Sequence, residues 1–261
     1  MWRSAVLAVC LVCGSRALLA EERPVEILRL SQASTESGVI DYAALPRLGG
    51  THAVISTAAL DLSAIDLPKI DLHNIRFQLH NYLVSSFPVV GVRDVQGFRP
   101  DEPIFWPLSD KTLFALYRDN NGSQRLFHST SEDGGRSRGK PLMTNFPNAT
   151  SKLFSMQTSR GYRVLVLNAN PAVGRRELHL AISEDGRVFT RLALLDIPSP
   201  ATVDDRAAEV WHKFRSGVAS LQYPHVIEHD DHLLIAFSRN KHQTEILRVS
   251  LDDIDVVRQQ R

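Results

Sequence analysis

Two decapeptides, LFHSTSEDGG at residues 126–135 and LHLAISEDGR at residues 178–187, decide the fold of this chain of 261 residues. In each, a run of apolar and β-favouring residues ends in the turn Ser-Glu-Asp-Gly. ILRVSLDDID, at residues 246–255, carries serine and aspartate at the corresponding places. The first two acidic positions, Asp133 and Asp185, are about 50 residues apart, a spacing typical of repeated structural units. The sequence therefore predicts one β-rich unit that occurs three times.

A hairpin precedes each of these turns. Apolar and aromatic residues dominate residues 112–118, 162–168 and 232–238, and each run follows a polar turn and another apolar run. The three repeat units are expected at about residues 101–150, 151–216 and 217–255, with the polar loop at 199–217 delaying the third. An isolated four-stranded sheet leaves two faces and two edges open, so such sheets pack face to face around an axis. The predicted fold class is therefore all-β, a β-propeller.

The first hundred residues contain less repeat signal. Strands are expected at 51–57 and 76–84, and residues 60–72 stay unassigned. Residues 1–20 combine a positive start, a short apolar run and a small residue at Ala20, which predicts a secretory signal peptide. The rest, 21–261, is predicted to be one domain, secreted or periplasmic. Both cysteines, Cys10 and Cys13, lie in the signal segment, so no disulfide is expected in the mature chain.

The charge balance disfavours two classes of partner. Thirty Lys and Arg against 29 Asp and Glu leave a formal net charge of +1, which supplies no attraction for nucleic acid or an anionic membrane. No apolar stretch after the signal segment is long enough to cross a bilayer.

Two of the turns match a motif known as the Asp box. The first has the pattern S-x-D-x-G-x-[ST], and the second is one residue shorter and ends in an aromatic residue. The expected structural residues are Ser131, Asp133 and Gly135 in the first, and Ser183, Asp185, Gly186 and Phe189 in the second. The carboxylate is expected to accept bonds from backbone N–H groups of its own turn, and glycine supplies a positive φ. Arg138 stands where an aromatic residue is usual, which predicts a looser first turn.

The stretch from Glu102 to Asp255 resembles the BNR-repeat, exo-α-sialidase-like proteins of bacteria. The similar segments are EPIFWPL, LFALYRDN, TNFPNATSK, SEDGRVF, QYPHVIEHDDHLLIAFSRNK and ILRVSLDDID. FQLHNYL at residues 77–83 also resembles a segment that longer members follow with further blades before the EPIFWPL-like unit. This chain is thus a shortened member, and the resemblance implies a sialidase-type propeller with fewer than six complete blades.

The resemblance also implies site residues, because sialidases use a tyrosine nucleophile and arginines that hold the sugar carboxylate. Tyr223 is the expected nucleophile, with Glu102 and Asp119 as catalytic acidic residues. Substrate binding is expected from Arg118, Arg239, Asn168 and His225. The alternatives are that the charged residues at the strand ends only face solvent, and that Tyr223 is a half-buried strand aromatic. Neither a first-blade arginine nor an acid/base aspartate of the sialidase type can be placed in this sequence.

No cofactor and no metal are expected. His225, His229 and His232 lie close together in the sequence, but the third lies beyond a turn from the first two. The predicted function is an exported sialidase-like glycoside hydrolase that acts on terminal acidic sugars of glycans. The alternatives are a non-catalytic Asp-box propeller that binds glycans or a protein partner, and a shortened chain that folds poorly or only on association.

Overall fold

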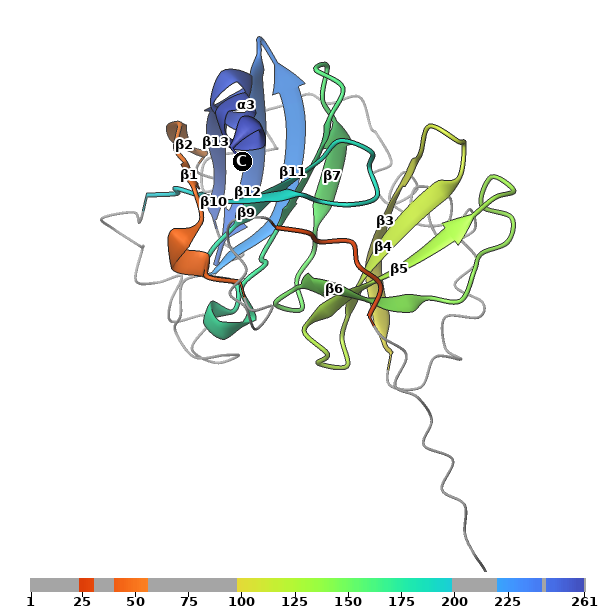
Figure 1. The fold of residues 1–261 in the computed structure, drawn as a ribbon. Helices are drawn as coiled ribbons and strands as arrows, with labels where there is room; N and C mark the ends of the chain where they lie inside the picture. The colour runs from red at the N-terminus through yellow and green to blue at the C-terminus, as the bar shows by residue number, and fades with distance from the viewer. Residues whose placement is uncertain (1–23, 31–39, 56–97, 199–219, 241–242, 261) are drawn as a thin grey trace, which may run out of the picture.

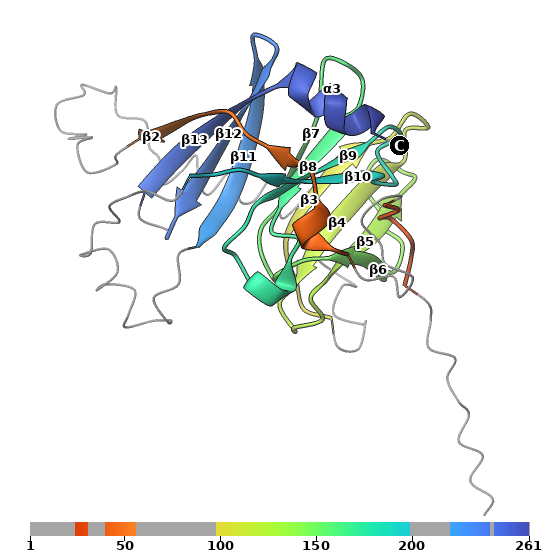
Figure 2. The ribbon, with the colours of Figure 1, turned by 60° about the vertical axis from the view of Figure 1, so that its left-hand side comes forward.

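The computed structural model describes residues 24–30, 40–55, 98–198, 220–240 and 243–260 (Figure 1). The predicted signal peptide, the strand expected at 76–84, the unassigned segment 60–72 and the loop 199–217 lie outside these residues. The strands among the described residues form three sheets, which we call blades I, II and III in chain order. Figures 1 and 2 show blades I and III on opposite sides of blade II.

Each blade is a meander of antiparallel strands. Blade I has the order β3 (Pro100–Pro107), β4 (Leu113–Asp119), β5 (Arg125–Ser131) and β6 (Leu142–Pro147). Blade II has the order β7 (Phe154–Gln157), β8 (Arg163–Leu167), β9 (His179–Ser183) and β10 (Arg191–Leu195), with β1 (Arg47–Leu48) added in parallel to β10. Blade III has the order β11 (Leu221–His229), β12 (His232–Arg239), β13 (Gln243–Ser250) and β2 (Thr51–Ile55). Short 3-10 helices occupy Tyr42–Ala44 (η1) and Pro171–Val173 (η5), and one α-helix, α3, spans Leu251–Gln259.

The fourth strand of blade III comes from the N-terminal part of the chain. β2 pairs antiparallel with β13, from Thr51 opposite Arg248 to Ile55 opposite Thr244. This confirms the strand predicted to begin at residue 51. Gly50 is needed just before it, because a Cβ at that position would lie 2.0 Å from the carbonyl oxygen of Arg248.

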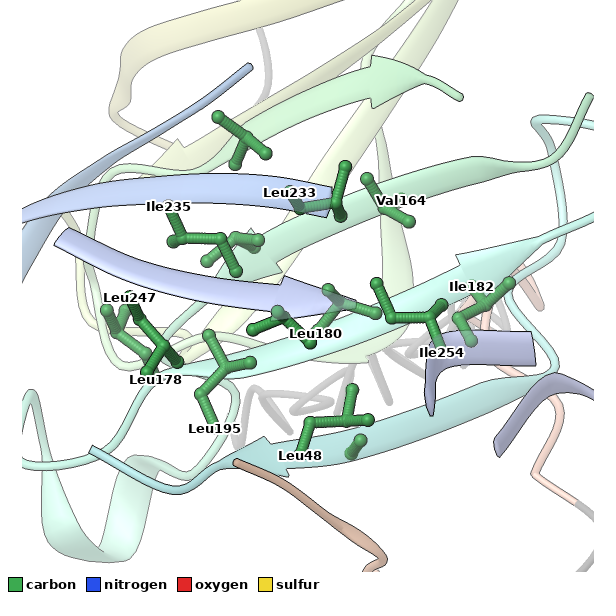
Figure 3. Close-up of a cluster of buried hydrophobic side chains, with 14 of the residues drawn as sticks. Leu48, Val164, Leu178, Leu180, Ile182, Leu195, Leu233, Ile235, Leu247 and Ile254 are labelled. Atoms are coloured by element: carbon green, nitrogen blue, oxygen red, sulfur yellow. The ribbon is translucent and has the colours of Figure 1, made fainter. Parts of the chain in front are cut away.

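Blade II is buried on both faces, and this explains why its strands are continuously apolar. All five residues of β8 are buried. Side chains alternate across a strand, so Val164 and Val166 join a cluster shared with blade III, while Leu165 and Leu167 join a cluster shared with blade I. Figure 3 shows the first of these clusters between the strands of blades II and III.

Blades I and II are joined through the second Asp-box turn. The indole Nε1 of Trp106 donates to the carbonyl of Gly186 at 2.9 Å. A Cβ at Gly186 would lie 3.1 Å from Leu108 and 3.2 Å from the Trp106 nitrogen, so a glycine allows this close approach. Below the turn, the buried ring of Phe189 meets Phe146 edge-on, with 5.7 Å between the ring centroids.

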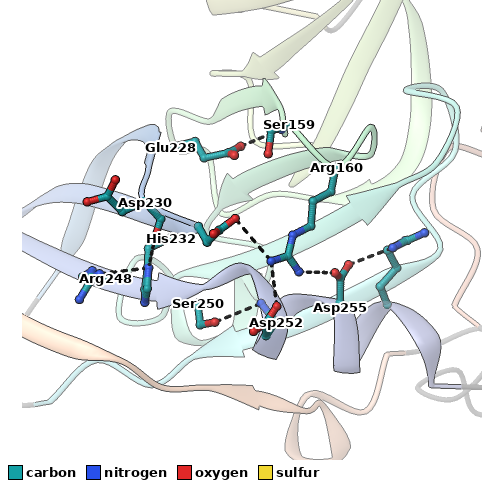
Figure 4. Close-up of polar contacts among 11 residues, drawn as sticks. Ser159, Arg160, Glu228, Asp230, His232, Arg248, Ser250, Asp252 and Asp255 are labelled. Atoms are coloured by element: carbon teal, nitrogen blue, oxygen red, sulfur yellow. Dashed lines mark hydrogen bonds and ion pairs between the residues drawn. The ribbon is translucent and has the colours of Figure 1, made fainter.

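Blades II and III are joined by charged contacts as well as by the shared core. Arg160, in the turn between β7 and β8, contacts Asp252 at 2.8 Å and Asp255 at 2.5 Å on α3 (Figure 4). In the same turn, the N–H of Ser159 donates to Glu228 of β11 at 2.8 Å. Although burial raises the pKa of Asp255, hydrogen bonds from Arg160 and Arg258 bring it below its usual value.

The prediction of a third Asp-box copy at residues 250–255 is wrong. Only its serine, Ser250, occupies the corresponding place. Ser250 ends β13 opposite His232, the place that Ser131 and Ser183 occupy in their blades. The chain then forms α3, and the Ser250 hydroxyl caps it by accepting from the N–H of Asp252. Without a glycine after Asp252 the tight turn is unfavourable, whereas Asp252 and Asp253 suit the positive end of a helix dipole.

The described residues form an all-β, propeller-like fold, the fold class that the sequence predicts. The three blades in the described part of the chain stand side by side and do not close into a ring (Figure 2). No helix among the described residues is long and apolar enough to cross a bilayer.

His179 on β9 makes the stability of this fold dependent on pH. The side chain is fully buried, and burial lowers its pKa from 6.5 to about 4. The unfolded chain therefore binds a proton at this imidazole more readily than the folded chain does. The contribution of neutral His179 to the free energy of unfolding is fully present above pH 6.5 and is lost as the pH falls toward 4. A difference of about 2.5 pKa units corresponds to roughly 3 kcal/mol.

The test is chemical denaturation at several pH values between 7 and 4. His179→Gln is expected to remove most of the loss of stability in this window. The control is His229→Gln, because His229 is exposed and its removal leaves the loss unchanged. Equal pH dependence in wild type and His179→Gln would contradict the assignment.

Candidate functional site

The first Asp-box turn is held by its own side chains. Ser131 Oγ donates to Asp133 Oδ1 at 2.8 Å and accepts from the N–H of Gly135 at 2.8 Å. Asp133 accepts from the N–H of Ser137 at 2.8 Å and from its hydroxyl at 2.6 Å. The bonds from Ser137 and Ser131 lower the pKa of Asp133 to about 2. Gly134 and Gly135 supply φ values of 73° and 90°.

The second turn repeats this arrangement in a shorter form. Ser183 Oγ donates to Asp185 and accepts from the N–H of Gly186, at 3.0 and 2.9 Å. Asp185 Oδ1 accepts from the N–H groups of Arg187 and Val188, at 2.7 and 2.8 Å. Both turns therefore have the structural role that was predicted for them.

Arg138 replaces the usual aromatic residue of the first turn without loosening it. Its Nη1 donates to the hydroxyl of Tyr117 at 2.8 Å, and its guanidinium lies 5.4 Å from the centre of that ring. The serine and aspartate side chains make four internal bonds in each turn, those given above for Ser131 and Asp133 and for Ser183 and Asp185. The expected looser first turn is not seen.

The opposite ends of the blades, where the first strands begin, hold the predicted catalytic residues. Glu102, Thr150 and Tyr223 have φ values of 43°, 50° and 56°. Pairing slips between Asp101 and Ile104 in β3 and between Gln222 and His225 in β11, and Thr150 shortly precedes β7. Glu102 and Tyr223 are each followed by proline, which favours an extended conformation in the preceding residue.

Such backbone strain costs about 1–3 kcal/mol per residue and clusters at functional sites. Each of the three blades has such a residue in or shortly before its first strand, and positive φ values also occur at the Asp-box end, at Lys111, Asp230 and Asp231. In the sequence, the Glu-Pro and Tyr-Pro pairs mark two of these first-strand positions, each near the start of a repeat unit. Thr150 has no such signal and was missed.

Arg118 and Glu102 lie together. Arg118 Nη1 is 3.0 Å from Glu102, and Nη2 contacts Asp101, which also accepts from Asn120 at 2.7 Å. Burial raises the pKa of Asp101, but the hydrogen bonds from Arg118 and Asn120 outweigh this and lower it. The Nε of Arg118 is buried and has no hydrogen-bond partner in the structure.

Asp119 belongs to a turn of blade I. It is buried, and its carboxylate accepts from the N–H groups of Arg99, Asn121 and Ser123 at 2.8, 2.9 and 3.0 Å. These bonds assign Asp119 a structural part in shaping the turn after β4. Its predicted catalytic role has no support in this placement and stays a prediction.

Asn168 connects two blades. Its Nδ2 donates to the carbonyls of Glu177 at 2.7 Å and Leu221 at 3.0 Å, the second at the start of β11. Beside it, Arg175 donates to the side chain of Gln222 and to the carbonyl of Thr150, both at 2.6 Å. This polar junction holds the starts of β7 and β11 next to each other.

Arg239 lies further along its strand than Arg118 does along its own. Arg118 follows Leu113, the partner of Ser131, by five residues, whereas Arg239 follows His232, the partner of Ser250, by seven. Its guanidinium forms a buried ion pair with Glu245 and donates to the carbonyl of Pro198 at 2.8 Å. Each of the two arginines predicted to bind an anion, Arg118 and Arg239, is thus paired with carboxylates of its own blade.

Tyr223 and His225 stand on β11, at the bulge. The side chain of Tyr223 is 37% exposed. His225 lies against Phe154 of β7, with 4.1 Å between the ring centroids. Within the described residues, no group of three His, Cys, Asp or Glu side chains is placed to hold a metal ion.

A groove of about 400 Å³ opens beside the N-terminal segment, away from these residues. Tyr42, Arg125, Asn145 and Pro171 are among its lining residues. None of the predicted site residues lines it, so it is not the site that the sequence indicates.

Asp-box turns on antiparallel blades define an open, propeller-like β fold. Residues 95–235 match the BNR repeat-like domain family. The chain belongs to this family. A search of curated proteins found no match.

Solved structures similar to this chain include a sialidase with 22% identity over 57% of this chain and a TM-score of 0.41. The NanB sialidase of Streptococcus pneumoniae has 15% identity over 58% and a TM-score of 0.42. The intramolecular trans-sialidase of Ruminococcus gnavus has 14% identity over 64% and a TM-score of 0.44. The matched parts span 13%, 23% and 35% of these three chains.

Proposed function

We propose that this chain is an exported sialidase-like glycoside hydrolase that acts on terminal acidic sugars of glycans. The observation that carries the proposal is the exposed Tyr223, held at φ 56° at the end of the blades where Arg118 and Glu102 also lie. Strain of this kind persists where the surrounding structure maintains it, and it pre-positions a side chain.

In the proposed reaction, Tyr223 Oη passes its proton to the carboxylate of Glu102 and attacks the anomeric carbon as the bond from that carbon to the leaving oxygen breaks. The leaving oxygen takes a proton from water, and water then hydrolyses the glycosyl–tyrosine bond and returns a proton to Tyr223 Oη. Glu102 is the carboxyl group assigned to proton transfer, in preference to Asp119, whose oxygens are bonded to backbone N–H groups. Arg118, which Asp101 and Glu102 hold in place, is the arginine assigned to the sugar carboxylate.

The test is hydrolysis of a fluorogenic sialoside by the chain without residues 1–20. Tyr223→Phe is expected to abolish turnover, because it removes the nucleophilic oxygen. Tyr162→Phe is the matched control: its hydroxyl is buried without a hydrogen-bond partner in the core between blades II and III. Equal turnover by Tyr223→Phe and wild type would contradict the role of Tyr223.

One observation favours a second candidate, a non-catalytic module that binds glycans or a protein partner. Arg118 and Arg239 already have carboxylate partners, which weakens their attraction for an anionic sugar. No turnover of any acidic-sugar substrate, together with retained binding to sialylated glycans, would favour the module over the hydrolase.

A further inference from the structure

The connection between β8 and β9 of blade II, residues 168–178, reaches the start of blade III. It contains η5, the short green helix near the start of β11 in Figure 1. Asn170 caps η5 by accepting from the N–H of Ala172 at 3.2 Å, and its amide donates to Glu177 at 3.2 Å across the connection. Bonds of its own therefore hold this connection in shape, which makes it a firm support for its neighbours.

Two residues of the connection, Asn168 and Arg175, bind the segment that leads into Tyr223. The carbonyl of Arg175 accepts from the N–H of Leu221 at 2.7 Å, and its Nη1 donates to the side-chain oxygen of Gln222 at 2.6 Å. Asn168 Nδ2 donates to the carbonyl of Leu221 at 3.0 Å. The two residues before Tyr223 are thus bonded to blade II through the backbone of one and the side chain of the other.

The same two residues of the connection bind the segment before β7. Arg175 Nη2 donates to the carbonyl of Thr150 at 2.6 Å, and the carbonyl of Asn168 accepts from the N–H of Ala149 at 2.9 Å. Thr150 and Tyr223 are the residues with positive φ at the starts of blades II and III, at 50° and 56°. One guanidinium therefore links the carbonyl of the first to the side chain that precedes the second.

A guanidinium suits this link because its N–H groups point in fixed directions within one plane. The acceptors of Arg175 belong to different blades, and both bonds are 2.6 Å long. Gln222 is 8% exposed and Asn168 is fully buried, so these bonds form largely out of water, where a hydrogen bond is stronger. The backbone at residues 221–222 sets where the side chain of Tyr223 lies, and Arg175 fixes that backbone.

We propose that Arg175 is a positioning residue for Tyr223, which it holds in place through Gln222 and Thr150. This inference deepens the proposed function and rests on it. Because Arg175 acts through other residues, loss of its guanidinium is expected to slow the chemical step more than it weakens substrate binding. A displacement of about 1 Å in a reacting group lowers a rate by about 10²-fold.

The kinetic test uses the chain without residues 1–20 and a fluorogenic sialoside. Arg175→Met keeps the apolar stem and removes the donors, so kcat is expected to fall about 10–100-fold while KM stays within about two-fold. Arg176→Met is the matched control and is expected to match wild type. Arg176 is the next residue, is exposed, and donates to the carbonyl of Val173 in its own connection at 3.0 Å. A higher KM with unchanged kcat in Arg175→Met would overturn the proposal.

Two further variants separate positioning from a general loss of stability. Gln222→Met removes one acceptor of Arg175, so it is expected to lower kcat as well. Adding it to Arg175→Met is expected to cause no further loss, because both changes remove the same bond. Guanidinium ions at millimolar concentration are expected to restore part of kcat in Arg175→Ala, whereas they would only destabilise a variant that is poorly folded. Multiplicative losses in the double variant, or inhibition in place of rescue, would refute the role of Arg175.

Fluorine NMR tests the positioning without catalysis. Fluorotyrosine at position 223 is expected to give the same narrow resonance in the wild-type background and in Arg176→Met, and a shifted and broadened resonance in Arg175→Met. A chain that hydrolyses no sialoside would contradict the proposed function and would leave this measurement intact, so the two failures are distinguishable. An identical resonance in Arg175→Met and wild type would show that Arg175 does not position Tyr223.

Discussion

Phe189→Ala is expected to lower the free energy of unfolding by about 3–5 kcal/mol, the usual cost of deleting a buried phenylalanine ring. Phe189 is fully buried between blades I and II, against Phe146. Its backbone also pairs with the N-terminal segment. The N–H of Phe189 donates to the carbonyl of Ile27 at 2.8 Å, and its carbonyl accepts from the N–H of Arg29 at 2.9 Å. A cavity here disturbs an Asp-box turn, an interface between blades and the N-terminal segment together.

Chemical denaturation measures this effect, and Phe105→Ala is the matched control. Phe105 has the same ring but is 40% exposed, so its removal is expected to cost much less. Similar losses from the two variants would show that the second Asp box does not join blades I and II as described.

The second large effect is expected at the buried ion pair of blade III. Glu245 is fully buried and forms an ion pair with Arg239. His52 Nε2 lies 2.8 Å from the same carboxylate. Burial raises its pKa, but hydrogen bonds from Arg239 and His52 outweigh this and lower it, so the group is charged in the folded state. Glu245→Ala leaves the buried Arg239 without its counter-charge and is expected to cost about 3–5 kcal/mol.

Two variants accompany this measurement. Glu26→Ala removes a carboxylate whose ion pair with Arg29 is exposed, and no measurable loss is expected. The double variant Arg239→Met with Glu245→Leu replaces the buried pair by apolar side chains and is expected to recover most of the stability. If the double variant is stable but binds acidic sugars poorly, Arg239 has a functional role besides its structural one.

Much of the fold followed from sequence because its determinants are local. The β4, β8 and β12 strands were predicted within one or two residues, since their apolar runs reflect burial in a blade. The Asp boxes were predicted for the same reason, because Asp133 and Asp185 bond groups no more than four residues away. The helix α3 also had a local signal, a serine followed by two acidic residues without glycine, but it was interpreted as a third turn.

The contacts of the candidate site were harder to predict from the sequence, because the residues that pair there are far apart in the chain or belong to different strands. Arg118 contacts Glu102 because both stand at the same end of adjacent strands, a pairing that was not predicted from the sequence. Arg239 was expected to face a common pocket, and no pattern in the sequence showed that Glu245 and Pro198 bind it. Asn168 likewise acts as a bridge to Leu221, 53 residues away, which only the packing of blade II on blade III creates.

The decapeptides at 126–135 and 178–187 by themselves determined the repeat, the turns and the all-β class. Hydrogen bonds within a turn and the alternation of a strand depend on neighbours a few residues apart, so a sequence contains them directly. Tertiary structure decided which strand completes blade III and which carboxylates hold the two arginines. Those outcomes depend on segments brought together over long distances in the chain, as β2 and β13 are, and packing selects them.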